Sequence, residues 1–62
     1  MTETELLDFA RSRKGVDVFL TRKEVSLWTR KTEPKEVARR PLGMPVERAE
    51  EILRAEGVEV FS

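Results

Sequence analysis

The spacing of apolar residues along this chain alternates between a helical and a strand-like period. Residues 3–14 space their leucines and alanine three or four apart, after Thr2 and Glu5 in the arrangement of a capping box, which predicts a first helix. In residues 15–20 (GVDVFL), three aliphatic residues, Val16, Val18 and Leu20, then alternate with Asp17 and Phe19. This second pattern predicts a short, half-buried strand.

The middle of the chain is predicted to form two more helices. Residues 21–31 (TRKEVSLWTRK) begin with a second Thr-x-x-Glu capping box and place Val25 and Trp28 three apart, on one helical face. Trp28 is the only tryptophan, and we expect it to anchor the core, with an exposed interaction role as the alternative. Residues 32–40 (TEPKEVARR) hold Pro34 where a first helical turn tolerates its missing N–H.

The end of the chain again shows a helical pattern followed by a strand pattern. Residues 46–56 (VERAEEILRAE) predict a last helix that Gly57 ends, and residues 58–61 (VEVF) predict a second strand. A lone strand leaves its backbone groups unpaired, and only two segments have the strand pattern, so we expect these two strands to pair. Their valines would then face the helices, and Phe19 and Phe61 would form an apolar patch on the outer face.

Residues 37–53 combine a β-branched residue and an alanine, then a glycine, then small or apolar residues at helical spacing. These positions are Val37, Ala38, Gly43, Ala49 and Ile52. The pattern resembles the helix-turn-helix of bacterial and phage transcription regulators, and with the flanking strands the element order resembles a reduced winged helix. The resemblance implies an α+β, mostly helical domain with a two-stranded sheet. The chain departs from it at Pro41, one extra residue, and in the acidity of the second helix.

Length and composition further restrict the kinds of protein to which this chain can belong. The 62 residues suffice for one domain, residues 1–62, and a chain of this size buries only roughly 60% of its unfolded surface. Cysteine and histidine are both absent, and no metal or cofactor motif occurs, so we expect no metal, no cofactor and no enzymatic activity. The sequence has neither a signal-peptide pattern nor a membrane-spanning stretch, which predicts a cytoplasmic protein that does not enter a membrane.

The formal net charge is zero, but it is unevenly distributed. Residues 1–10 carry a net −3, residues 11–48 carry eleven basic and five acidic residues (+6), and residues 49–62 carry −3. A basic middle segment suggests contacts to DNA phosphates. The candidates are Arg22, Lys23, Arg30, Lys31, Lys35, Arg39 and Arg40. The resemblance adds Arg48, in the first turns of the second helix, as the candidate for a base edge.

Three hypotheses on function follow. The first is a small DNA-binding transcriptional regulator of helix-turn-helix or winged-helix type, with double-stranded DNA as its partner. The second is a protein-interaction module, a phage- or plasmid-type accessory or inhibitory protein that binds a larger machine such as RNA polymerase. Its partner-binding candidates are Glu47, Glu50, Glu51, Phe19 and Phe61. The third is a structural domain that associates with itself as a homodimer. The three glutamates oppose entry of their helix into a DNA groove.

Overall fold

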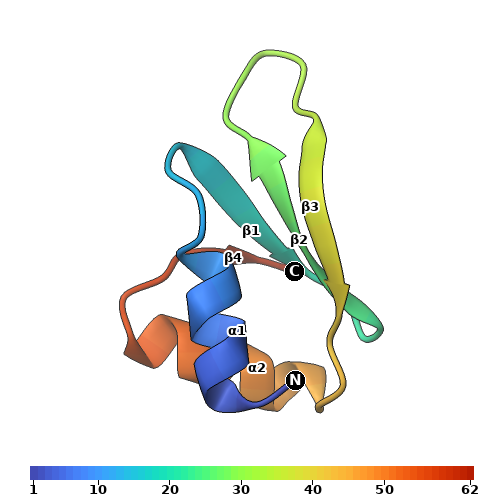
Figure 1. The fold of residues 1–62 in the computed structure, drawn as a ribbon, viewed down its shortest axis with the longest axis vertical. Helices are drawn as coiled ribbons and strands as arrows, with labels where there is room; N and C mark the ends of the chain where they lie inside the picture. Colours follow the sequence, from blue (N-terminus) through green and yellow to red (C-terminus); the bar gives the residue numbers. More distant parts are fainter.

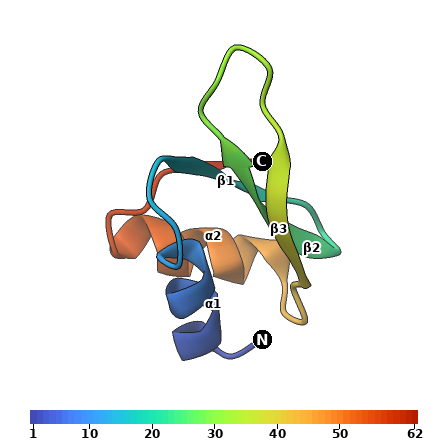
Figure 2. The same cartoon turned by 45° about the horizontal axis from the view of Figure 1, so that its top comes forward.

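Two helices pack on one face of a four-stranded sheet. The computed structural model describes all 62 residues, and Figure 1 labels its elements. In chain order they are α1 (Glu3–Ala10), β1 (Val16–Leu20), β2 (Glu24–Thr29), β3 (Glu36–Pro41), α2 (Val46–Ala55) and β4 (Val60–Phe61). Figure 2 shows both helices beneath the sheet, which leaves the opposite face of the sheet without a covering element.

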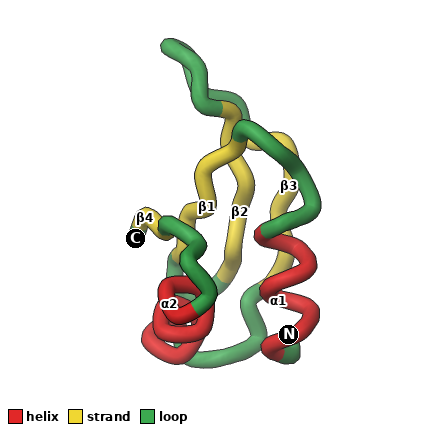
Figure 3. Tube along the Cα trace, turned by 90° about the vertical axis from the view of Figure 1, so that its left-hand side faces the viewer, coloured by secondary structure: helices red, strands yellow, loops and turns green.

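The sheet is mixed, with the strand order β3-β2-β1-β4. The pairs β1–β2 and β2–β3 are antiparallel, whereas β1 and β4 are parallel. The chain leaves β3 at one edge, crosses beneath the sheet as α2 and returns as β4 at the other edge. The β2–β3 loop extends beyond the strands and away from the helices (Figure 3).

The core lies between the helices and the sheet. Twelve buried apolar residues form one cluster: Leu6, Phe9, Ala10, Val18, Leu20, Val25, Leu27, Leu42, Ala49, Ile52, Leu53 and Val60. Each helix contributes one apolar stripe, and each of the two central strands contributes alternate residues, because successive side chains of a strand point to opposite faces. One face of the sheet therefore supplies its share of the core, and the other face remains available to solvent.

The predicted first helix is confirmed, with its capping box, but it is shorter than expected. The Glu5 backbone N–H donates to Thr2 Oγ1 at 3.1 Å, and the Thr2 backbone N–H donates to Glu5 Oε1 at 2.9 Å. The Thr2 backbone N–H first, and the Thr2 side chain second, lower the pKa of the Glu5 carboxyl below its ordinary value, because both favour the charged carboxylate. The helix ends at Ala10 rather than at residue 14.

The pairing of the first and last predicted strands is confirmed. Val18 lies opposite Val60 and Phe19 opposite Phe61, so the two valines are buried and the two phenylalanines lie on the outer face. The structure adds that the two strands run parallel and that β4 is shorter than predicted. Because both strands follow a helix and run the same way, their matching sequence patterns place matching residues side by side.

The last helix is also confirmed, and Gly57 ends it as predicted. Gly57 has φ +77°, its N–H donates to the Arg54 carbonyl at 3.0 Å, and the Val58 N–H donates to the Leu53 carbonyl at 2.9 Å. This pair of hydrogen bonds is a Schellman motif, which favours a residue without Cβ at the left-handed position.

The prediction of a mostly helical protein with a two-stranded sheet is wrong. Helices hold 29% of the residues and strands 31%, and the sheet has four strands. Residues 21–31 and 32–40, both predicted as helices, contribute β2 and β3 and the loop between them. The side chain of Thr21 does accept a hydrogen bond from the Glu24 N–H, at 3.1 Å, but the bond closes the turn between β1 and β2. The same side-chain chemistry serves both a helix cap and a tight turn.

The expected role of Trp28 is wrong for the same reason. As a strand, β2 places Val25 and Leu27 against the helices and turns Ser26 and Trp28 to the outer face. Val25 is fully buried, whereas Trp28 is only half-buried. Valine, threonine and tryptophan are all favoured in strands, and this preference is satisfied once β1 and β3 offer pairing on both sides.

The helix-turn-helix and winged-helix interpretation is therefore also wrong. Val37 and Ala38, expected in the first of the two helices, lie on the edge strand β3, and α2 packs against α1 and the sheet instead. Gly43 does have the left-handed backbone expected of it, with φ +62°. It also allows a close approach, because a Cβ there would lie 2.5 Å from the Met1 nitrogen, which donates to the Leu42 carbonyl at 3.1 Å.

Candidate functional site

The basic side chains divide into those that pair with a carboxylate and those that do not. Ion pairs between 2.6 and 3.9 Å hold five of them: Arg11, Arg30, Arg39, Arg48 and Arg54. Seven have no carboxylate oxygen within 4.0 Å: Arg13, Lys14, Arg22, Lys23, Lys31, Lys35 and Arg40. The unpaired cations contribute most to the attraction of an anion, since an ion pair largely cancels its own field at a distance.

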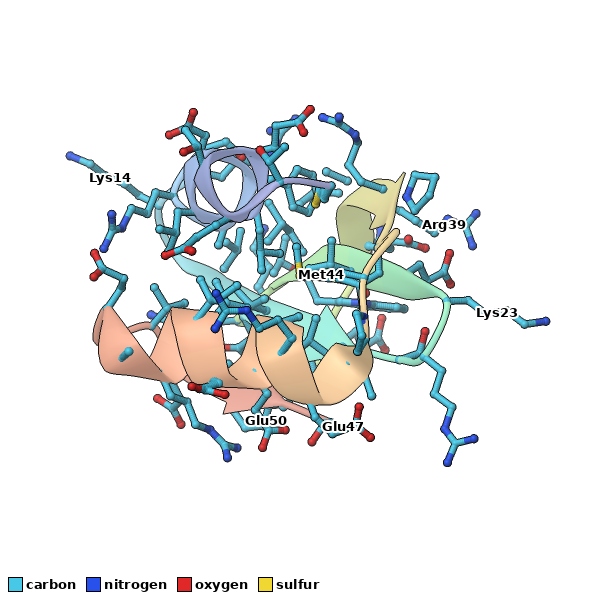
Figure 4. All side chains as sticks on the ribbon, turned by 90° about the horizontal axis from the view of Figure 1, so that it is seen from below. Lys14, Lys23, Arg39, Met44, Glu47 and Glu50 are labelled. Atoms are coloured by element: carbon cyan, nitrogen blue, oxygen red, sulfur yellow. The ribbon has the colours of Figure 1, made fainter.

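The residues proposed from sequence to bind DNA do not form one surface. Arg22 and Lys23 lie in the β1–β2 turn, whereas Arg30, Lys31 and Lys35 lie in or beside the β2–β3 loop, at the other end of β2. Figure 4 shows Lys23 and Lys14 pointing to opposite sides of the molecule.

Arg39 and Arg40 are separated by the strand that carries them. Arg39 lies on the outer face, where its guanidinium pairs with Glu36 at 3.2 Å and with Glu24 at 3.7 Å. Arg40 lies on the helix side, with its guanidinium carbon 5.9 Å from the centre of the Phe9 ring. Neighbouring residues of a strand point to opposite faces, so these two arginines cannot act on the same ligand surface.

Arg48 and the three glutamates proposed as partner-binding residues belong to α2. Arg48 pairs with Glu3 at 3.5 Å and with Glu51 at 3.9 Å, so its guanidinium is engaged within the chain. Glu50 pairs with Arg54 at 2.6 Å, whereas Glu47 has no basic partner. Glu47 is exposed, whereas Glu50 is half-buried and also accepts a hydrogen bond from the Ser62 hydroxyl at 3.3 Å; Figure 4 labels both.

Four basic residues gather where the α1–β1 and β2–β3 loops meet. Arg13, Lys14, Arg30 and Lys31 line a cavity of about 470 Å³ together with backbone and small side chains of the neighbouring strands. The Arg30 backbone N–H donates to the Gly15 carbonyl at 3.4 Å, which holds the two loops side by side.

We call this group, together with Lys35 at the end of the same β2–β3 loop, the basic end of the molecule. The Lys35 backbone N–H donates to Thr29 Oγ1 at 3.0 Å, which fixes the second side of that loop. Glu33 is the only acidic residue in the two loops, residues 11–15 and 30–35. Sequence reasoning missed Arg13 and Lys14, although the RSRKG run that contains them was a visible signal.

The outer face of the sheet carries three aromatic side chains. Phe19 and Phe61 stack at a centroid distance of 5.2 Å and are 37% and 39% exposed. Trp28 meets Phe19 edge to face at 6.0 Å. The structure thus brings together the two phenylalanines proposed as partner-binding residues, and it adds a tryptophan that sequence reasoning had placed in the core.

Trp28 also forms part of a shallow groove on this outer face. Its indole Nε1–H donates to Ser26 Oγ at 2.9 Å, so the ring lies back along β2 and covers Ser26, which is only 9% exposed. The groove has a volume of about 530 Å³, and we call it the aromatic groove. Its lining residues are Phe19, Thr21, Glu24, Ser26, Trp28, Pro34, Glu36 and Arg39.

The remaining features of the chain add no other candidate site. No group of three or more acidic residues is placed to hold a metal ion, and neither helix has the length and apolar character needed to cross a membrane. Comparisons with protein-family models, with curated proteins and with solved structures found no match. The chain is thus identified by its structure alone, as a small α+β protein with a mixed four-stranded sheet.

Proposed function

We propose that this protein binds nucleic acid through phosphate groups held at the basic end. The supporting observation is the distribution of unpaired cations. Four of the seven, Arg13, Lys14, Lys31 and Lys35, belong to the two loops that meet there, and Arg30 lies between them. The other three unpaired cations are divided between the β1–β2 turn and the helix side of β3.

Counterion release explains why a local cluster of unpaired cations favours nucleic-acid binding. Each phosphate neutralised by a lysine or arginine releases condensed counterions, and this release drives nucleic-acid binding without base contacts. The whole chain has a net charge of zero, so only a local excess of cations can supply this attraction. The concave shape of the basic end adds to it, since a cleft lined by one sign of charge concentrates the field.

This proposal keeps the nucleic-acid partner expected from the sequence but changes the residues that contact it. The contacts come from two loops, and no recognition helix is involved. α2 carries Glu47, Glu50 and Glu51 on its surface, and its Arg48 is already paired, so α2 faces away from the phosphates in this proposal.

The experiment is a binding titration of fluorescein-labelled mixed-sequence oligonucleotides, single- and double-stranded, followed by anisotropy over a series of salt concentrations. It compares the native protein with Lys14→Ala/Lys31→Ala. We expect the variant to lower the slope of log K against log salt by up to about 2 for the duplex, because each lost phosphate contact contributes about 0.9.

The matched control is Arg22→Ala/Lys23→Ala, which removes the same charge from the opposite end of β2. Both control residues are exposed and unpaired, as are Lys14 and Lys31. The control should leave the salt slope close to the native value. Equal losses in both variants would contradict a localised site, and absence of binding at low salt would contradict the proposed function itself.

A further inference from the structure

We infer that the aromatic groove holds one unpaired base of a single-stranded nucleic acid whose phosphates lie on the basic end. The inference rests on the proposed function and makes it more specific, because it names single strands as the substrate class. Trp28 and Phe19 would contact the base, and the lysines of the β2–β3 loop would contact the neighbouring phosphates.

The geometry of Trp28 suits a stacking role. Its only polar atom, Nε1, already donates to Ser26 on the same strand, so the indole offers a ligand its π face and no hydrogen-bond donor. Phe19 stands beside it with an interplanar angle of 69°. The face of the indole can stack on a planar base, and the steeply inclined Phe19 ring bounds one side of the position that the base would occupy. Such stacking is possible for any base.

The groove and the basic end share one loop. Pro34 lines the groove, and it lies between Lys31 and Lys35 in the sequence. Arg30 follows Trp28 by two residues, and its guanidinium bonds to Asp17, the residue paired with Trp28 across the sheet, at 2.7 Å. A strand whose backbone follows this loop therefore passes beside the groove that Trp28 lines.

The charges in the groove favour a base over either a phosphate or a basic peptide. Glu24 and Glu36 would repel a phosphate, but Arg39 lies between them and leaves only one net negative charge. A lysine or arginine of a protein partner would have to compete with Arg39 for the same carboxylates. A neutral aromatic base needs neither carboxylate, because its contact is with the ring face.

A duplex cannot make this contact, because its bases are stacked on one another inside the helix. We therefore expect single strands to use both the basic end and the groove, and duplexes to use the basic end alone. The two sites then contribute separately, and they can be tested separately.

The tryptophan fluorescence of the protein reports on the aromatic groove alone, since Trp28 is the only tryptophan and the chain has no tyrosine. The first experiment titrates the native protein at low salt with a mixed-sequence single strand, the matching duplex and inorganic polyphosphate, and records tryptophan emission. Only the single strand should quench the emission. Polyphosphate and duplex should compete for binding without quenching, because neither places a free base on the indole.

The second experiment measures the affinity of the variant Trp28→Leu by anisotropy. We expect about a tenfold loss of affinity for the single strand and no change for the duplex, in line with the measured effect of one stacked base. Trp28→Phe should recover part of the loss. Phe61→Leu is the matched control, because it removes an aromatic ring from the same face but outside the groove.

The outcomes separate the two proposals. A single strand that binds without quenching, and binds Trp28→Leu as tightly as the native protein, overturns base stacking and leaves the proposed function standing. Failure of the oligonucleotides and of polyphosphate to bind overturns both. Quenching by an arginine-rich peptide, with none by the single strand, assigns the groove to a protein partner and overturns the inference. The quenching result uses the native chain, so it does not depend on the folding of any variant.

Discussion

The two faces of the sheet are built from alternate residues of the same strands, yet they have opposite characters. On β2, Val25 and Leu27 are fully buried beneath the helices, whereas the neighbouring Trp28 is half-exposed on the other side. The covered face is entirely apolar at its centre. The outer face combines aromatic rings with ion pairs such as Arg39 with Glu24. The comparison teaches that one face can hold the fold together while the other is free to bind.

The largest expected effect is on the covered face. Leu27→Ala should lower the free energy of unfolding by about 2–5 kcal/mol, because Leu27 is fully buried and its removal leaves a cavity. The total stability of small domains is roughly 5–15 kcal/mol, and a chain this short belongs at the low end. Urea denaturation followed by circular dichroism measures the change. A loss below about 1 kcal/mol would show that the covered face does not carry the fold.

A smaller effect is expected on the outer face. Phe19→Ala should cost about 1–3 kcal/mol, toward the lower end, because the aromatic pairs with Phe61 and Trp28 contribute about 0.5–1.5 kcal/mol each and the ring is already 37% exposed. The same denaturation experiment provides the comparison with Leu27→Ala. Equal costs for the two variants would remove the distinction between a face that stabilises the fold and a face that is exposed.

The smallest effect is expected away from both faces, at the start of α1. The folded-state pKa of Glu5 is lowered, so its hydrogen bonds stabilise the protein above the unfolded-state pKa, and this stability is lost as the pH falls through the folded-state pKa. Glu5→Gln removes that contribution. The native protein should therefore exceed the variant in urea midpoint at neutral pH, and the difference should shrink as the pH falls below the ordinary pKa of a glutamate. A difference that does not change with pH would contradict the assigned role of the carboxylate.

The sequence predicts those parts of this fold whose signals are local. The capping box of Thr2 and Glu5 and the left-handed Gly57 mark ends of helices that do form. The pairing of Phe19 with Phe61 was also predicted, from the matching patterns of the two short segments, although the premise that these were the only strands is wrong, since β1 also pairs with β2. In these places local preference and the final packing agree.

The middle of the chain could not be assigned in this way. Residues 21–31 begin with a capping box and place Val25 and Trp28 three apart, so the local pattern indicated a helix where the structure has a strand. The outcome was decided by tertiary pairing, because β2 lies between β1 and β3 and exchanges hydrogen bonds with both. Strand preference depends on such neighbours more than helix preference does.

The candidate site, too, could be predicted from the sequence only in part. The basic character of Arg30, Lys31 and Lys35 was visible in the sequence, but the contact that brings Arg13 and Lys14 beside them joins two loops far apart in the chain. The aromatic groove was missed because Trp28 had been placed on a helix, facing the core. A strand assignment for residues 24–29 would have turned it outward.

The parallel pairing of β1 with β4 has a consequence for how the protein is made. The β1–β2–β3 pairing involves residues 16–41 alone, but the other edge of β1 has no partner until the chain has continued through α2 to β4. An exposed strand edge pairs readily with other chains, and Phe19 lies on this one. The two residues of β4 thus cover a strand edge that would otherwise be open to pairing with another chain.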